Sequence, residues 1–107
     1  MTQTALKAFG LGLGLIVPNC FHYTAPENTP AKYAVWAELS GTHLAANNKE
    51  AEGAFEIAVD YFTKTEFDAT IDNISAFLDG FGSWNIESIQ YEEATGYIHY
   101  EWRISYA

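Results

Sequence analysis

The period of the hydrophobic pattern changes within one short stretch of this chain, and this change constrains the fold more than any other feature. Large apolar residues occupy alternate positions of the segment 55–62, at Phe55, Ile57, Val59 and Tyr61. Such alternation is typical of a strand with one buried face. From position 67 the apolar residues instead recur every three or four positions, at Phe67, Ile71, Ile74 and Leu78. This second spacing predicts an amphipathic helix that directly follows the strand.

Polar and small residues mark both ends of the predicted helix. Thr65 is expected to cap the first turn, and Asp68 lies three residues later in the position of a capping box. Gly80 and Gly82 are expected to end the helix, because glycine is common just after a helical C-terminus.

Four further segments predict strands. Residues 20–23 form a brief apolar patch, 32–39 alternate, and 84–91 with 97–106 read as a hairpin across a turn that ends at Gly96. One side of the last arm is expected to face the core, with Ile98, Tyr100, Trp102, Ile104 and Tyr106. These segments predict an α+β fold with a mostly antiparallel sheet of four to five strands covered by two helices.

The remaining segments complete a single domain over residues 1–107. Residues 2–9 predict a short helix that Gly10, Gly12 and Gly14 would weaken or end, so 1–18 are expected to form a helix or arm. Residues 24–31 contain two prolines and predict an exposed loop. Residues 40–52 are small and polar, with a plausible turn at Asn47 and Asn48.

The charge balance narrows the possible partners. The chain carries 5 basic and 14 acidic residues, for a net charge of −9. So few cations argue against binding to a phosphate backbone, and DNA is more readily repelled than held. The apolar run 8–17 is too short for a membrane span, and the single cysteine excludes an internal disulfide.

Candidate catalytic and metal-ligating groups are few. Cys20 and His22 would point to the same side of a strand, but a buried thiol beside a strand histidine is the favoured interpretation. His22, His43 and His99 lack the close spacing of a helical ligand pair. The chain is therefore expected to be no enzyme and to bind neither cofactor nor metal.

Two tryptophans suggest protein contacts. In the alternating segment 32–39, Tyr33 and Val35 share one side, while Trp36 falls on the apparent solvent side; Trp84 lies next to a loop. Exposed tryptophan often marks an interface. Two interpretations of Trp36 stay open here: it is an interface anchor, or the N-terminal helix covers it.

The order and the residue sequences of several segments resemble those of small tail terminator, or tail completion, proteins of long-tailed bacteriophages. These proteins have the lambda-type tail terminator fold. The resemblance covers most of 32–107 and rests on 6–10, 32–36, 47–49, 57–64 and 91–100. It implies a ring, commonly a hexamer, that caps the tail tube, ends its polymerisation and meets the head connector within the virion. DNA would pass through without specific binding, and no membrane is involved.

The subunits of such an acidic ring would have to meet through uncharged surface patches or through the few basic residues. The expected interface residues are Trp36, Asn47, Asn48, Lys49 and Trp84. Other functions remain open: an acidic inhibitor that mimics DNA, a neighbouring neck or head-tail joining protein, or a small-molecule binder or enzyme with an aromatic pocket between helix and sheet.

Overall fold

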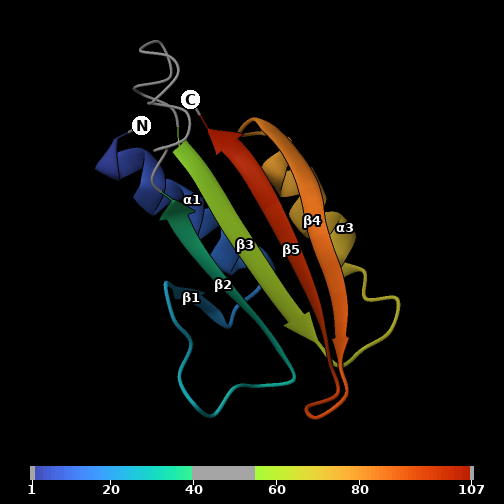
Figure 1. Ribbon diagram of the computed structural model, residues 1–107. Helices are drawn as coiled ribbons and strands as arrows, with labels where there is room; N and C mark the ends of the chain where they lie inside the picture. Colours follow the sequence, from blue (N-terminus) through green and yellow to red (C-terminus); the bar gives the residue numbers. More distant parts are fainter. Residues whose placement is uncertain (1, 40–54, 107) are drawn as a thin grey trace.

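The fold consists of one sheet with two helices on one of its faces in the part of the chain that is described. The computed structural model describes residues 2–39 and 55–106, apart from the side chains of Phe55 and Tyr106. The elements are α1 (Gln3–Ile16), β1 (Cys20–His22), β2 (Lys32–Leu39), β3 (Phe55–Thr63), α3 (Thr70–Leu78), β4 (Ser83–Glu92) and β5 (Tyr97–Tyr106). The sheet has five strands in the order β1-β2-β3-β5-β4 (Figure 1). The predicted α+β class, with a mostly antiparallel sheet and two helices, is confirmed.

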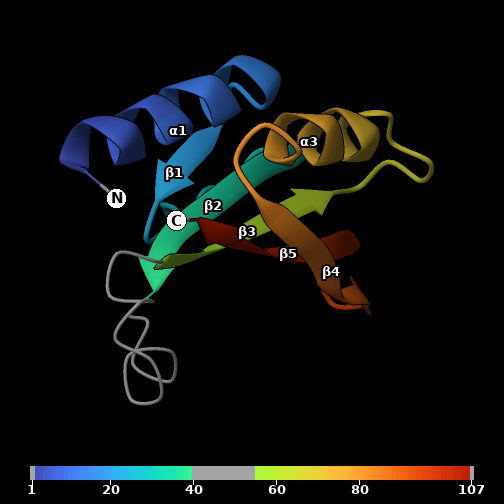
Figure 2. The same ribbon diagram turned by 90° about the horizontal axis from the view of Figure 1, so that it is seen from above.

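The two described helices lie on the same side of the sheet, and no described helix lies on its other face (Figure 2). β1 and β2 pair in parallel, and the other described pairs are antiparallel. The core fills the space between helices and sheet, with Phe9, Leu13, Ile57, Val59, Tyr61, Ile74, Leu78, Trp102 and Ile104 fully buried. None of the described helices is long and apolar enough to cross a membrane.

The face of β2 that points into this core is opposite to the predicted one. Ala34 and Trp36 are buried beneath α1, and Trp36 stays only 6% exposed. The register places Trp36 opposite Val59, which is fully buried in the same layer. Both faces of β2 carry apolar residues, so alternation alone could not show which one the helices cover. Of the two open interpretations of Trp36, coverage by the N-terminal helix is therefore the correct one.

Helix α1 is longer than predicted, because two of its glycines serve close packing. A Cβ atom at Gly10 would lie 2.5 Å from the Trp36 ring, and one at Gly12 would lie 2.6 Å from the Phe77 ring. Without a side chain, the helix backbone can approach both rings. The dispersion and burial gained there offset the roughly 1 kcal/mol that each glycine costs a helix.

Helix α3 begins later than predicted. Phe67 has a positive φ of 57° and is 93% exposed, so it does not belong to the buried stripe. Thr65 does not cap the helix; Ala69 is the N-cap residue and makes no side-chain bond there. The Asp68 carboxylate instead accepts a hydrogen bond from the Thr70 backbone N–H at 3.0 Å. The predicted positions Ile74 and Leu78 are fully buried, as expected.

Asp68 joins the start of α3 to the sheet. Its buried carboxylate accepts bonds from the Tyr61 hydroxyl at 2.6 Å and the Thr63 hydroxyl at 2.8 Å, and the Lys32 ammonium lies 3.4 Å away. Burial alone would raise the pKa of Asp68, but these donors lower it below its ordinary value. Burial and the bond to Asp68 raise the pKa of Tyr61 to about 12. A predicted capping residue thus also links β3 to the helix.

Candidate functional site

The tryptophans that were expected to anchor an interface belong mainly to the core. Trp36 packs against Phe9, with ring centroids 5.3 Å apart, and against His22 at 3.9 Å. It cannot meet another subunit while α1 covers it. Trp84 is half-buried, and its indole N–H donates to Asp79 at the end of α3 over 2.6 Å. The other expected interface residues, Asn47, Asn48 and Lys49, lie outside the described residues.

Sequence reasoning missed three apolar side chains on β4 that water can reach. We call Ile86, Ile89 and Tyr91 the β4 stripe; Ile89 is 58% and Tyr91 65% exposed. They pair in register with Trp102, Tyr100 and Ile98, so they face the helix side of the sheet. Figure 2 shows that β4 runs away from the helix layer along its length. The stripe therefore extends the core face beyond its helical cover.

The signal for this stripe was present in the sequence but hidden by a bulge. The pairing of β4 with β5 shifts between Ile86 and Ser88, so apolar residues fall on even numbers before the shift and on odd numbers after it. A bulge inserts one extra residue and restores the same face on the far side. Read without a bulge, the segment SWNIESIQYE does not alternate, and its apolar residues do not appear to share a face.

β4 is also an edge strand. It spans ten residues and pairs with β5, and no described strand pairs with its outer edge. Its outward backbone N–H and C=O groups are therefore open to another strand. Natural edge strands are usually short or carry lysine or proline, and β4 has neither residue. Its protective devices are the bulge and two charged residues, Glu87 and Glu92.

A shallow hollow of about 640 Å³ adjoins the β4 stripe. It is lined by Lys64, Glu66, Ile89, Tyr91, Gly96 and Ile98. β4 itself carries Glu87 and Glu92 and no basic residue, and Glu93 follows in the turn. The site thus combines an open strand edge, an apolar stripe and an acidic border. Proteins that bind extended peptides by strand addition use such an open edge with pockets for alternate side chains.

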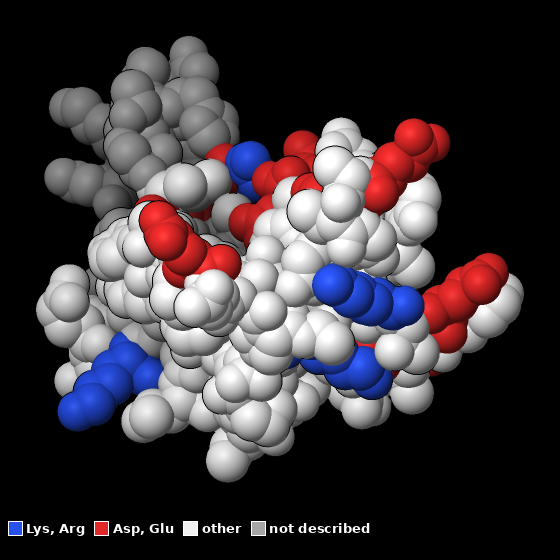
Figure 3. Space-filling model, turned by 90° about the horizontal axis from the view of Figure 1, so that it is seen from below, with Lys and Arg blue, Asp and Glu red and all other residues white. Residues whose placement is uncertain are grey.

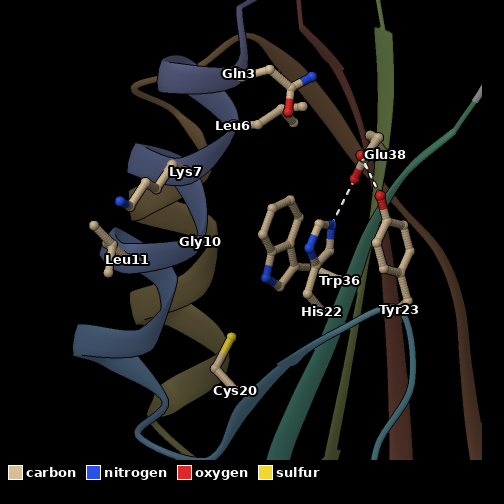
Figure 4. A pocket seen from close by; sticks show the side chains of 10 residues that line it. All are labelled: Gln3, Leu6, Lys7, Gly10, Leu11, Cys20, His22, Tyr23, Trp36 and Glu38. Atoms are coloured by element: carbon tan, nitrogen blue, oxygen red, sulfur yellow. Dashed lines mark hydrogen bonds and ion pairs between the residues drawn. The ribbon is translucent and has the colours of Figure 1, made fainter.

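A second hollow of about 380 Å³ lies between α1 and the β1 edge (Figure 4). His22 stacks between Tyr23 at 3.8 Å and Trp36 at 3.9 Å. The Glu38 carboxylate lies 2.7 Å from the His22 Nε2 atom. It also accepts a hydrogen bond from the Tyr23 hydroxyl at 2.5 Å. Burial would raise the pKa of Glu38, but the bonds from Tyr23 and His22 lower it. These polar groups already satisfy one another.

The candidate thiol and imidazole pair, Cys20 and His22, lines this second hollow, but its thiol is not activated. Cys20 and His22 share the helix side of the sheet, since their β2 partners are Ala34 and Trp36. Burial raises the pKa of the Cys20 thiol to about 11. At neutral pH the sulfur is therefore protonated, whereas nucleophilic attack requires a thiolate.

The histidines do not assemble a metal site in the described part of the chain, where no group of three or more potential ligands occurs. His43 lies outside that part. On the sheet face opposite the two described helices, His99 Nε2 lies 2.7 Å from the Asp60 carboxylate, and its Nδ1 lies 3.8 Å from Glu92. The hydrogen bond with Asp60 raises the pKa of His99 above its ordinary value, although burial opposes the shift.

Charges on the face seen in Figure 3 are dispersed. Acidic side chains occur in separate groups, with basic side chains and broad neutral areas between them. A protein that mimics DNA needs carboxylates in rows at phosphate-like spacing. This face does not present such rows.

Scans against protein-family models and searches of curated proteins and solved structures find no match to this chain.

Proposed function

We propose that this chain is a structural protein of a phage tail, which forms a ring that caps the tail tube, ends its polymerisation and joins it to the head connector. The observation that carries the proposal is the open β4 edge with its apolar stripe. Long edge strands with exposed apolar residues are expected sites of pairing with another chain, and a partner strand can cover them. A chain that keeps such an edge is best explained as a component of an assembly.

Two further features support a tail protein in particular. The resemblance to tail terminators runs through β2, β3 and the β4–β5 hairpin, which supply four of the five strands of the sheet. The net charge of −9 on each copy suits a ring through which DNA slides, because carboxylates facing a channel repel phosphates. The proposed location is therefore the virion, at the tail or neck.

Electron microscopy of tail tubes tests this proposal. Tube protein would be polymerised from tail initiation complexes with and without this chain. We expect uniform tube lengths and a ring at the finished end only when the chain is present. Tubes of equally broad length distribution in both reactions, with bare ends, would overturn the proposal.

A further inference from the structure

We propose that the β4 edge receives an extended segment of a partner protein, which adds a sixth strand whose apolar side chains alternate with basic ones. This inference deepens the proposed function and rests on its claim that the chain acts by assembly, since it names the chemistry of the segment that docks. It concerns the border of the sheet formed by β4, the β4 stripe and the acidic residues around it.

The backbone of β4 provides the first part of the argument. An added strand lies about 4.8 Å from its neighbour and exchanges main-chain hydrogen bonds along its length. β4 is ten residues long, whereas the opposite edge strand, β1, has three. Of the two edge strands that the structure describes, β4 alone can therefore pair along its length with a strand of ordinary size.

The side chains of β4 specify an alternating partner. On the helix side, an added strand would lie next to the β4 stripe and would bury it with apolar residues of its own. On the other side it would meet Asn85, Gln90 and Glu92, which pair with Arg103, His99 and Tyr97. Cross-strand neighbours of these residues should be polar. A segment with apolar and polar residues in alternation satisfies both faces.

Charge decides the nature of the polar residues. Glu87, Glu92 and Glu93 border the site, and β4 contains no base to neutralise them. The Arg103 guanidinium lies 2.8 Å from Glu101, and the Lys64 ammonium lies 4.8 Å from the Tyr97 ring centroid. His99 lies 3.8 Å from Glu92 but pairs more closely with Asp60, at 2.7 Å, so it offsets the border charge only in part. A second copy of this chain would bring the same three carboxylates to the contact. A basic segment of a different protein is therefore favoured over self-pairing.

Synthetic peptides test the backbone and the charge separately. The probe is a ten-residue peptide of alternating valine and lysine with blocked ends, and its binding is measured by calorimetry. One matched peptide replaces lysine with glutamate, and another keeps lysine but is N-methylated at every residue, so that neither of its edges can donate main-chain hydrogen bonds. We expect only the unmodified valine–lysine peptide to bind. Equal binding of the N-methylated peptide would overturn the inference, because it would show attraction by charge alone.

Two variants of the chain locate the binding site. Ile89→Lys removes an apolar contact and adds a positive charge at β4, while Leu15→Lys adds the same charge at an 88% exposed position of α1. We expect Ile89→Lys to weaken peptide binding about tenfold or more, the effect of losing a central contact, and Leu15→Lys to change it little. Equal effects of the two variants would overturn the inference. Circular dichroism checks folding, and Ile89→Thr replaces Ile89→Lys if the latter unfolds.

Further outcomes separate this inference from the proposed function. If the wild-type chain caps tubes and Ile89→Lys caps them equally well, the β4 inference fails while the tail function stands. If the peptide binds as expected but tube lengths do not respond to the chain, the tail function fails while the strand site stands. Concentration-dependent dimers of the wild-type chain that disappear in Ile89→Lys, without peptide binding, would show a second copy on β4 and overturn the inference.

Discussion

The two edges of the sheet are built in opposite ways. The β1 edge is only three residues long, and the side chains of Tyr23, His22 and Trp36 form a stack beside it, next to α1. The β4 edge is ten residues long and keeps its stripe exposed. A three-residue edge offers few main-chain groups to an added strand, whereas a ten-residue edge offers many. The proposed docking of a partner strand uses the longer edge.

The two regions are expected to contribute to different properties: the residues around α1 to stability, and the β4 stripe to recognition of a partner. Around α1, side chains are fully buried, so changes there should alter the free energy of unfolding. Along the β4 stripe the side chains are mostly exposed, so changes there should alter binding to a partner and leave unfolding almost unchanged. The following substitutions test this division, in order of decreasing expected effect.

Phe9→Ala should produce the largest change. Phe9 is fully buried, and its ring packs against Trp36, Phe77 and Phe81 with centroids 5.0 to 5.4 Å apart. Removing a buried phenylalanine costs about 3–5 kcal/mol of unfolding free energy. Urea denaturation measures the loss, and Leu15→Ala on the exposed side of α1 should be nearly neutral. A loss below about 1 kcal/mol would mean that α1 is not a stabilising part of the core.

Gly10→Ala and Gly14→Ala form a matched pair within α1. A Cβ at position 10 would lie 2.5 Å from the Trp36 ring, whereas one at position 14 meets nothing within 4 Å. We expect Gly10→Ala to destabilise by about 1–3 kcal/mol through overpacking. Gly14→Ala should stabilise by up to about 1 kcal/mol through helix propensity. The melting temperatures of both variants test these expectations. Stabilisation by Gly10→Ala would show that α1 does not pack closely against the Trp36 ring.

His99, which lies near the hairpin end of β4, should make the free energy of unfolding depend on pH. Its pKa is raised in the folded state, above the value of about 6.5 expected in the unfolded chain, so folding favours the protonated imidazole. The stabilisation from its pairing with Asp60 is therefore fully present below about pH 6.5. It is lost as the pH rises through the raised value.

Unfolding at a series of pH values, compared between wild type and His99→Gln, measures this effect. The variant should lose the decrease in stability that the wild type shows as the pH rises above about 6.5 and through the raised pKa of His99. Nuclear magnetic resonance titration of the His99 ring supplies a direct pKa. A value at or below that of an exposed histidine would contradict the pairing with Asp60.

Ile89→Thr should have the smallest effect on folding. Ile89 is more than half exposed, and threonine retains a branched side chain that suits a strand. We expect the unfolding free energy to change by less than about 0.5 kcal/mol. A loss comparable to that of Phe9→Ala would show that β4 is a stabilising edge and would remove the contrast between the two edges.

Many elements could be predicted because their signals are local. The strand 32–39 is found at the predicted bounds, and the turn that ends at Gly96 has the expected positive φ of 79°. The burial of Ile57, Val59 and Tyr61 follows the predicted alternation. In each case the pattern depends on residues that are neighbours in the sequence, where side-chain direction repeats with the backbone.

The candidate site was predicted less well than the fold. Trp36 was a candidate anchor but fills the core, and the β4 stripe went unnoticed because a bulge shifts its period. Neither the burial of Trp36 nor the shared face of the β4 stripe can be predicted from residues that are neighbours in the sequence. The burial of Trp36 requires Gly10, far away in the chain, to admit its ring.

The sequence by itself determined which segments are strands and helices, how the last hairpin turns, and how acidic the molecule is. The tertiary structure alone decided which face of β2 is covered, how far α1 continues through its glycines, and which edge of the sheet stays open. Periodicity is a property of adjacent residues, whereas coverage depends on which distant segments pack together. The open edge at β4, and the partner proposed for it, are consequences of that packing.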